Sequence, residues 1–419
     1  MPRPAPTRGF ELVDPGHYAA NGQPHAIWSA LRRESPVHWC DHPDLHPFWA
    51  ITKHDDICTI SKQPDLFLSE PGIMLMPADQ ADVDRSQGVG AMRTIIEMDP
   101  PKHRSYRKVA SPWFTPRALD RLDGEIEKSA RELVDRLAGE TGEGECDFAM
   151  DVAARHPLRI LSSVLGISRE LEPEMLRLTN QLFALDDPEL GRPGEDREKA
   201  VMELGLEIFQ LLAPIIEDRK KSPRDDLASV LANGIVDGQP MGPMETLGYY
   251  LITFTAGHDT TKNALAGGMG AFLDHPDQLE LLQRRPELVN DAVEEIVRWT
   301  SPVNFMRRTA ARDTELRGQK IRKGDHLGLF YCSANRDEEI FEEPFRFDIT
   351  RDPNPHLGFG VGEHFCLGSH LARRSQRALW RELATRLEWI EPAGQREWIQ
   401  SSFVVGFKHL PVRYKLKRA

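Results

Sequence analysis

The sequence predicts one mainly helical domain that also contains a few short β-strands. Helical periodicity dominates from about residue 101 to 300, whereas strand-like runs are short and occur near the N-terminus and in the last third. These strands are too few for a sheet of alternating strands and helices. Because no linker-like or repeated segment divides the 419 residues, we expect a single domain over residues 1–419, with about 1–15 as a flexible N-terminal segment.

The elements are expected in the following order along the chain. A helix over residues 24–34 precedes a hairpin whose strands are PVHWCD and PFWAITK. Residues 66–100 carry Pro, Gly, Asp and Met without periodicity, which predicts a long loop. Three helical stretches come next, namely TPRALDRLDGEIEKSARELVDRLAG, VMELGLEIFQLLAPIIEDRKK and METLGYYLITFTAGHDTTKNALAGGMGAFLDHP. Short strands in DTELRGQKIRKGDHLGLF precede a last helix over about residues 369–388.

The composition argues against several classes of function. A net charge of −12 disfavours nucleic acid as a partner, because phosphate binding needs a broad face of clustered cations. No stretch approaches the roughly 20 uncharged apolar residues that span a bilayer, and the N-terminus lacks the apolar core of a signal peptide. We therefore expect a cytoplasmic protein without a membrane partner. The five cysteines include no C-x-x-C pair, which argues against a disulfide framework or a multi-thiolate zinc site.

The segment HLGFGVGEHFCLG, residues 356–368, concentrates glycines, histidines and one cysteine. A dinucleotide-binding fingerprint fails here, because its spacing needs glycine where Glu363 or Phe365 stands. A zinc site is a second possibility, although its candidate ligands crowd one loop with no second pair elsewhere. Those ligands would be His356, His364, Cys366 and His370.

A single cysteine that binds a flat cofactor fits this segment best. Gly360, Gly362 and Gly368 permit backbone conformations closed to other residues, so the chain can turn tightly around Cys366 and a flat ligand can approach closely. The helix expected directly after Cys366 offers free N–H groups that favour a thiolate. A thiolate on such a loop suits a haem iron. A buried, inert cysteine is the simpler explanation when the loop is considered alone.

Three further patterns indicate candidate sites. LITFTAGHDTTKNALAGG is an apolar helix with a polar island at residues 258–261, and a carboxylate buried there is costly unless it has a function or joins an interior hydrogen-bond lattice. Glu295 and Arg298 are neighbours on a helix at i and i+3, although periodicity alone also permits an ordinary solvated ion pair. His103 and Arg107, four residues apart, share one face of an expected helix.

The pattern F-x-x-G-x-H-x-C-x-G resembles the haem-binding signature of the cytochrome P450 monooxygenases. Its fixed positions are Phe359, Gly362, His364, Cys366 and Gly368. The resemblance extends from about residue 25 to the C-terminus. It implies the P450 fold, a helix-rich triangular prism in which haem b lies between an oxygen-binding helix and the helix that follows the cysteine loop. Cys366 would then be the metal ligand, and Phe359, His364 and Gly368 would contact the cofactor.

The stretch TAGHDTT is similar to the oxygen-activation motif of that family. The resemblance implies that Asp259 delivers protons and that the Thr260 hydroxyl holds the water network through which they pass. Ala256 and Gly257 would line the place where O₂ binds.

The remaining motifs take structural and cofactor-binding roles by the same resemblance. Glu295 and Arg298 match the family's E-x-x-R pair, which braces the haem loop together with an arginine of a P-x-R-F stretch. Arg346 is the expected third member, with Arg351 as the alternative. The residues expected to bind the haem propionates are His103, Arg107, Arg308 and His356.

The implied activity is hydroxylation of an unactivated C–H bond in a small hydrophobic substrate, with O₂ as co-substrate. TAGHDTT, ANRDEEIF and HLGFGVGEHFCLG are most similar to the branch that hydroxylates monoterpenes and alkylbenzenes. Alternatives are sterol side-chain or alkane hydroxylation in the same family, and a haem-binding sensor, which would not need Asp259 and Thr260. Candidate pocket residues are Met74, Met76, Leu182, Phe183, Leu185, Ile252, Thr255, Val303, Phe305, Phe403 and Val404.

Electrons are expected from separate partner proteins, a ferredoxin and its reductase, because the chain contains no flavin or nicotinamide fingerprint. A basic stripe on the helix after Cys366 suits an acidic electron carrier, with Arg104 and Lys108 close by, although such a stripe is also compatible with simple solvation. The stripe comprises His370, Arg373, Arg374, Arg377 and Arg381.

Overall fold

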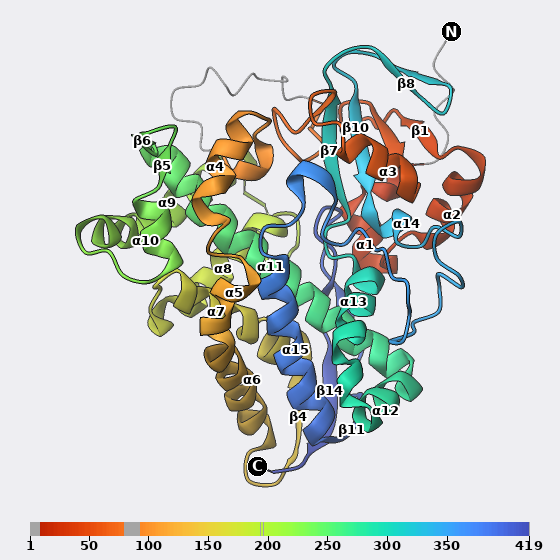
Figure 1. Cartoon of the computed structure of the whole chain (residues 1–419). Helices are drawn as coiled ribbons and strands as arrows, with labels where there is room; N and C mark the ends of the chain where they lie inside the picture. The colour runs from red at the N-terminus through yellow and green to blue at the C-terminus, as the bar shows by residue number, and fades with distance from the viewer. Residues whose placement is uncertain (1–8, 79–92, 193, 196, 419) are drawn as a thin grey trace.

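Helices form most of the computed structural model, which describes residues 9–78, 93–192, 194–195 and 197–418 (Figure 1). The helices are α1 (Pro15–Asn21), α2 (His25–Glu34), α3 (His54–Ser61), α4 (Lys102–Ala110), α5 (Pro116–Leu119), α6 (Asp123–Ala138), α7 (Arg155–Val164), α8 (Glu172–Phe183), α9 (Arg197–Lys221), α10 (Leu227–Ala232), α11 (Pro243–Asp274), α12 (Pro276–Arg284), α13 (Val289–Thr300), α14 (Tyr331–Ala334) and α15 (Ser369–Arg386). The predicted mainly helical class is confirmed.

The strands are short and form small sheets. They are β1 (Val37–Cys40), β2 (Phe48–Ile51), β3 (Phe67–Leu68), β4 (Glu143–Asp147), β5 (Ile235–Val236), β6 (Gln239–Pro240), β7 (Phe305–Ala310), β8 (Thr314–Leu316), β9 (Gln319–Ile321), β10 (His326–Phe330), β11 (Leu387–Pro392), β12 (Glu397–Trp398), β13 (Phe407–His409) and β14 (Pro411–Leu416). Three of them, β4 to β6, lie within residues 101–300, where the sequence predicts mainly helices.

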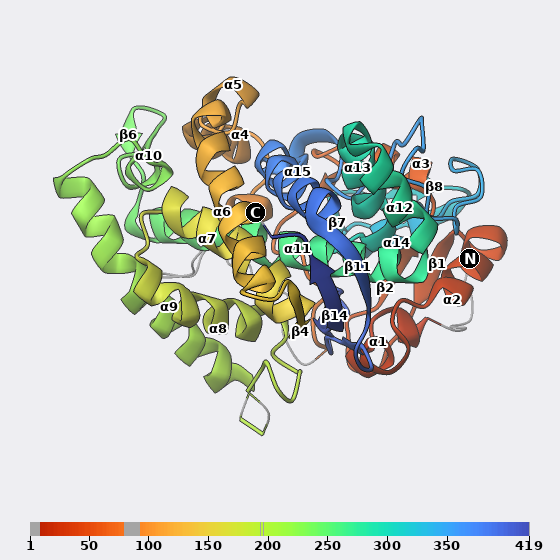
Figure 2. The same cartoon turned by 90° about the horizontal axis from the view of Figure 1, so that it is seen from below.

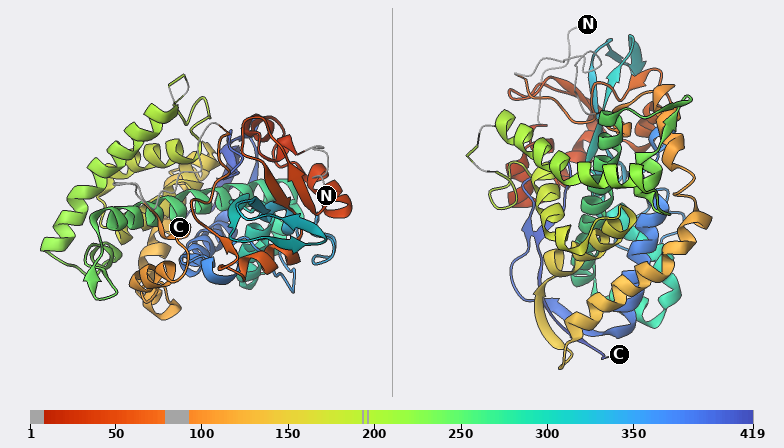
Figure 3. Two further views of the ribbon diagram at one scale, coloured as in Figure 1. Left: turned by 90° about the horizontal axis from the view of Figure 1, so that it is seen from above. Right: turned by 90° about the vertical axis from the view of Figure 1, so that its left-hand side faces the viewer.

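The largest sheet has the strand order β1-β2-β10-β7-β3 and lies to one side of the helices (Figures 1 and 3). β1 and β2 form the predicted antiparallel hairpin, with Trp39 opposite Trp49. β10 pairs in parallel with β2 and antiparallel with β7, so the sheet joins the N-terminal region to residues 305–330. This pairing fixes β7, which carries Arg308 to the candidate site.

The long helix α11 runs through the middle of the helical part and packs against α7, α9, α13 and α15 (Figure 2). Most of its residues are buried, and its polar residues are mixed with apolar ones on several faces. A long apolar helix is stable in water only when other elements cover it, which explains its central place. The molecule is thinner along the viewing direction of Figure 1 than across it, as the perpendicular views show (Figures 2 and 3).

The helix that follows the cysteine is anchored in the main core. Trp380 of α15 lies with its ring centroid 5.1 Å from that of Phe272 on α11 and 6.5 Å from that of Phe148. α15 also packs against α6 and α13. The segment that carries Cys366 therefore leads directly into a helix that is packed in the main core.

Two segments that the sequence predicts to lack regular structure fall partly outside the described residues. Of the expected flexible N-terminal segment, residues 1–8 are outside, whereas 9–15 include a short 3-10 helix with Leu12 fully buried and the start of α1. The predicted loop over 66–100 contains β3 and a short 3-10 helix at Ile95–Glu97, and residues 79–92 lie outside the described part. Within the described residues, no helix is both long and apolar enough to cross a membrane.

Replacing Trp380 with alanine should lower the free energy of unfolding by about 3–5 kcal/mol, because the large side chain leaves a cavity beside Phe148 and Phe272. Trp389 on β11 is 41% exposed, and its replacement should cost about 0.5 kcal/mol or less. Urea unfolding of both variants beside the unsubstituted protein measures the difference. Equal losses would contradict the place given to Trp380 in the core.

Candidate active site

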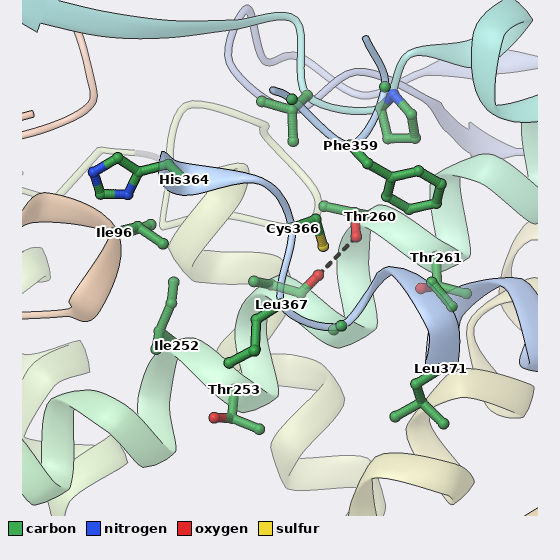
Figure 4. Close-up of a pocket in the computed structure, with 18 of the residues that line it drawn as sticks. Ile96, Ile252, Thr253, Thr260, Thr261, Phe359, His364, Cys366, Leu367 and Leu371 are labelled. Carbon is green, nitrogen blue, oxygen red and sulfur yellow. Dashed lines mark hydrogen bonds between the residues drawn. The ribbon is translucent and has the colours of Figure 1, made fainter. Parts of the chain in front are cut away.

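A cavity lies among α4, α7, α11, α13, β7 and the cysteine segment, residues 356–368 (Figure 4). Cys366 lines it together with Phe359, His364 and Gly368 of the same segment. The structure therefore brings together the fixed positions of the cysteine motif with residues of α11 and α4 that are about 100 or more positions away in the sequence. Most of the remaining lining is apolar, as expected for a site that excludes water.

The cysteine segment turns tightly before the sulfur. Gly360 and Gly362 have φ angles of 67° and 79°, in the left-handed region that residues with side chains disfavour. A Cβ at Gly362 would also lie 2.4 Å from the carbonyl oxygen of Ser61. Gly368 differs from the prediction, because its φ of −86° is open to any residue. A Cβ there would meet no described atom within 4 Å, so this glycine leaves space at the cavity wall instead.

The surroundings of the Cys366 sulfur determine its charge. Burial raises the pKa of the thiol, while hydrogen bonds from the backbone N–H groups of Gly368 and Ser369 lower it. The positive charges of Arg107 and Arg373 also lower this pKa. Because burial is the largest effect, a thiolate here needs a further positive partner, and a metal cation bound at the sulfur would provide one.

The second wall of the cavity is one face of α11. Thr260 lines it, and its Oγ1 donates a hydrogen bond to the carbonyl oxygen of Ala256 at 2.7 Å (Figure 4). Ala256 and Gly257 line the cavity too. A Cβ at Gly257 would lie 3.0 Å from the side chain of Leu161, so this glycine also permits close packing of α7 on α11. That packing role adds to the open space that the sequence predicts.

Asp259 lies in a buried polar cluster on another face of α11. Its carboxylate is 3.6 Å from the Nζ of Lys262 and accepts a hydrogen bond from the Asn263 side chain at 3.2 Å. Lys262 is fully buried and donates to the Oδ1 of Asn180 on α8 at 3.1 Å. Burial raises the pKa of Asp259, and Lys262 and Asn263 lower it less. The carboxyl group therefore holds a proton more readily than an exposed aspartic acid does.

Lys262 is a functional candidate that the sequence analysis missed. A lysine is rarely fully buried without a partner, and here it links the acid of α11 to α8. The i, i+3 spacing from Asp259 was the signal available in the sequence. Asn180 could not be found in this way, because it comes from a different helix.

His258 has a packing role. Its Nε2 donates to the carbonyl oxygen of Ala154 at 3.0 Å, and its ring stacks on Phe254. Burial lowers the pKa of His258 to about 3, so the ring is neutral near pH 7. This histidine ties α11 to the start of α7.

Four nitrogen-bearing side chains meet at the cavity wall. They are His103 and Arg107 of α4, Arg308 of β7, and His364. The rings of His103 and His364 lie 4.1 Å apart between centroids. Burial, followed by the charge of Arg308, lowers the pKa of His364 to about 2. Among the described residues, His103 Nε2 and His364 Nδ1 are buried and have no hydrogen-bond partner.

This arrangement fits haem b. Two guanidinium groups and buried ring nitrogens without partners suit a ligand that carries carboxylates, such as the propionates of a haem. The sulfur of Cys366, which lines the same cavity, would be available as a ligand to the haem iron. Within the described part of the chain, no three or more His, Cys, Asp or Glu side chains cluster in a way that could hold a metal ion. The alternative of a zinc site in the cysteine segment is therefore wrong.

His356 is not where the sequence analysis expects it. Its Nε2 lies 3.0 Å from the carboxylate of Glu294, and its Nδ1 accepts a hydrogen bond from the backbone N–H of Gly358 at 3.2 Å. Both ring nitrogens are thus bound by the protein itself. The prediction that His356 binds a propionate is wrong, and His364, eight residues later, takes the place beside the cavity.

Glu295 and Arg298 form a fully buried ion pair rather than a solvated one. Two hydrogen bonds of 2.7 Å join the guanidinium to the carboxylate. Nη1 of Arg298 also donates to the carbonyl oxygens of Asn335 and Pro344, each at 2.9 Å. The pair thereby fastens α13 to the loop that leads to the cysteine segment.

The third member of this group is Arg351, not Arg346. Nε of Arg351 lies 3.3 Å from the carboxylate of Glu295. The side chain of Arg346 is 59% exposed and bonds to Glu343 at 3.1 Å. Only the backbone carbonyl of Arg346 joins the group, by accepting from Arg298 at 3.2 Å. The expectation for Arg346 is therefore wrong, and the alternative named for it is correct.

Two of the predicted pocket residues, Ile252 and Val303, line the cavity. Thr255 instead faces a small apolar void between α8, α9 and α11, and Phe305 packs on Phe403 in the core at 5.4 Å between ring centroids. The predicted residues outside the lining are Met74, Met76, Leu182, Phe183, Leu185, Thr255, Phe305, Phe403 and Val404. Lining residues that the analysis missed include Ile73, Ile95, Ile96, Thr253 and Met306.

The helical spacing of α11 would have corrected part of the predicted list of pocket residues. Thr253 is seven residues before Thr260, so the two share a face, whereas Thr255 is turned by about 140° from Thr260 at 100° per residue. The other missed residues come from loops and from β7, where no periodicity relates them to the motif.

Replacing Lys262 with methionine should raise the pKa of Asp259 further, because the nearby positive charge that favours the carboxylate is lost. The carboxyl would then stay protonated to higher pH. Infrared difference spectra of the protonated carboxyl band over a pH series measure this, with Lys415→Met on the surface as control. A titration of Asp259 that does not move in Lys262→Met would contradict the assigned interaction.

Comparisons with known proteins agree with this geometry. The family model "Cytochrome P450" matches residues 73–418. Cytochrome P450-terp of Pseudomonas sp is 36% identical, covering 96% of each chain, and linalool 8-monooxygenase of Pseudomonas putida is 37% identical, covering 96% of this chain and 98% of the other. Steroid C26-monooxygenase of Rhodococcus jostii is 37% identical, covering 97% and 85%.

The solved structures agree as well. The crystal structure of CYP108D1 from Novosphingobium aromaticivorans superposes with a TM-score of 0.88 at 38% identity, covering all of both chains. Family match, relatives and fold together account for a cavity with one cysteine, a polar helix face and cations suited to propionates. The chain belongs to the cytochrome P450 family, and it is a monooxygenase that uses haem b and O₂.

Proposed function

We propose that this monooxygenase hydroxylates an unactivated C–H bond of a small hydrophobic substrate, with a monoterpene or an alkylbenzene as the favoured class. The observation that carries the proposal is the largely apolar cavity shared by Cys366 and Thr260. Haem b, when bound, supplies the activation of O₂. Cys366 would hold its iron, and the side chains that would hold its propionates are His103, Arg107, Arg308 and His364, which line the same cavity.

Thr260 and Asp259 are proposed to deliver protons to the cavity. The Thr260 hydroxyl lines the cavity while its proton points to the Ala256 carbonyl, so its oxygen can accept a hydrogen bond from a water molecule. Asp259 is the neighbouring residue, and its raised pKa makes it a proton donor nearer to neutral pH. To serve the cavity, its carboxyl must exchange contacts with Lys262 and Asn263 for water.

Apolar side chains support the choice of substrate class. They include Ile73, Ile95, Ile96, Ile252, Val303 and Met306. Such a lining holds a hydrocarbon mainly by shape and discriminates weakly between similar molecules. The relative named linalool 8-monooxygenase favours a terpene, and the steroid C26-monooxygenase keeps sterol side-chain hydroxylation as the second candidate.

A ferredoxin with its reductase is the proposed electron source. The cytoplasm is the proposed location of the protein. The face around the cysteine segment, between α4 and α15, is the proposed docking surface. Its exposed cations include Lys108 on α4 and Arg381 on α15. Four cations predicted for this surface instead bond to acidic or amide side chains of the chain itself, namely Arg104, Arg373, Arg374 and Arg377. All of these except Arg377 bond to carboxylates, so the net positive charge of this surface is smaller than the sequence suggests.

Thr260→Ala should divert electrons from product into hydrogen peroxide by several-fold, because the cavity loses the hydroxyl that orders water. Thr255→Ala is a matched control, since Thr255 makes the same kind of bond to a carbonyl of α11 but faces away from the cavity. Product and peroxide are measured against NADH consumed with added ferredoxin and reductase. Unchanged coupling in Thr260→Ala would contradict the proposed role.

Binding of a substrate in the cavity should displace water from the haem and shift the Soret band to shorter wavelength. Titrating monoterpenes, alkylbenzenes, linear alkanes and a sterol into the purified haem protein ranks the classes by dissociation constant. We expect the monoterpenes and alkylbenzenes to bind at least tenfold more tightly than the sterol, a difference of about 1.4 kcal/mol. Tighter binding of the sterol would favour the second candidate.

Charge reversal at Lys108 or Arg381 should weaken ferredoxin binding, and more strongly at low salt. Salt screens exposed charges beyond about 10 Å at 0.1 M, so the loss should fade as salt rises. Lys320→Glu on β9, in the β8–β9 hairpin, is the control. The dissociation constant for ferredoxin, measured over a series of salt concentrations, tests this. A loss of affinity that does not change with salt would indicate disturbed packing instead.

A further inference from the structure

A second ion pair lies beside the Glu295–Arg298 pair and has no role in the proposed chemistry. Glu294 of α13 accepts two hydrogen bonds from Arg373 of α15, at 2.6 Å from Nε and 2.7 Å from Nη2. This two-pronged geometry fixes the plane of the guanidinium group. The side chains are 29% and 21% exposed, so water screens the pair less than it screens a fully exposed one.

The same carboxylate also holds the start of the cysteine segment. Nδ1 of His356 accepts a hydrogen bond from the N–H of Gly358, so the ring proton lies on Nε2 and is donated to Glu294. Burial alone would raise the pKa of Glu294, but the bonds from His356 and Arg373 lower it to about 2. Glu294 is therefore ionised near pH 7 and binds two separate parts of the chain at once.

The guanidinium of Arg373 reaches the cysteine through an aromatic ring. Its central carbon lies 4.2 Å from the centroid of the Phe359 ring, a distance at which a cation is attracted to the ring face. Phe359 lines the cavity, and its carbonyl oxygen accepts the N–H of Cys366 at 2.9 Å. Contacts thus run without a gap from Glu294 through Arg373 and Phe359 to the backbone of Cys366.

We propose that Glu294 and Arg373 are positioning residues for Cys366: their ion pair fixes Phe359, whose carbonyl group in turn fixes the backbone of the cysteine. This inference rests on the proposed role of Cys366 as the iron ligand. Arg373 is then a structural cation at the site and not a free charge for docking.

The chain offers a close control at the next position. Arg374 of α15 also forms two ion pairs, with Asp120 at 2.7 Å and Asp123 at 2.6 Å, and its side chain is 18% exposed. Those partners lie on the side of α6 and not on the cysteine segment. Arg374→Gln therefore removes a similar interaction from the same helix without touching the Phe359 contact.

The test uses purified, haem-loaded Glu294→Gln, Arg373→Gln and Arg374→Gln. In the reduced protein treated with carbon monoxide, the first two should show a several-fold larger fraction absorbing at the shorter wavelength typical of lost thiolate ligation. Arg374→Gln should match the unsubstituted protein. Glu294→Gln replaces one oxygen by nitrogen in a partly exposed side chain, so it gives an answer even if Arg373→Gln folds poorly.

The midpoint reduction potential separates the effect of local charge from the effect of positioning. Arg373→Gln removes a positive charge near the thiolate and should lower the potential, whereas Glu294→Gln leaves that charge without its counter-ion and should raise it. Arg373→Lys keeps the charge but loses the flat group over Phe359, so it should keep the potential and not restore the spectrum.

Two results would overturn the inference. One is an unchanged carbon monoxide spectrum in both Glu294→Gln and Arg373→Gln. The other is an equal change in Arg374→Gln, which would mean that any ion pair on α15 matters as much. If the unsubstituted protein itself lacked the spectrum of thiolate ligation, the proposed role of Cys366 would fail first, and the inference with it.

Discussion

The proposed chemistry depends on keeping the sulfur of Cys366 as an anion in a largely apolar cavity. Burial opposes the charge, and the protein offsets this with backbone N–H groups at the start of α15 and with the charges of Arg107 and Arg373. A metal cation bound at the sulfur would complete the compensation. Each of these groups must keep its direction toward the sulfur, because hydrogen bonds weaken steeply when they are misaligned. The fold therefore has to keep the cysteine segment, although it is a loop, in one fixed conformation.

Two clusters of ion pairs, each built on a glutamate of α13, hold the loop in place. Glu295, Arg298 and Arg351 fasten the loop before the cysteine segment, and Glu294 with Arg373 fastens the segment to α15. Buried ion pairs add little net stability, since desolvation cancels much of the attraction. These ion pairs are therefore better explained by the fixed orientation that they give to the loop than by a gain in folding stability. A similar arrangement lies behind the opposite wall of the cavity, where Lys262 links Asp259 of α11 to α8.

Much of the fold and the centre of the site could be predicted from the sequence, because long periodic helices and the fixed spacing around Cys366 are local signals. Apart from Thr255, which the periodicity of α11 would have excluded from the cavity, the main errors lie where the chain has no period. Arg346 and Arg351 are five residues apart in one loop, and nothing in that loop says which side chain turns toward Glu295. His356 was misplaced for a related reason, since its partner, Glu294, comes from another element.

The most direct test of the account is the absorption spectrum of the reduced, carbon monoxide-treated protein, recorded for the unsubstituted chain and for Cys366→Ala. We expect the long-wavelength band of thiolate ligation in the first and its loss in the second, with Cys58→Ala unchanged, because Cys58 belongs to α3 and lies outside the cavity lining. A protein that is isolated without porphyrin, or a long-wavelength band that survives in Cys366→Ala, would contradict the account.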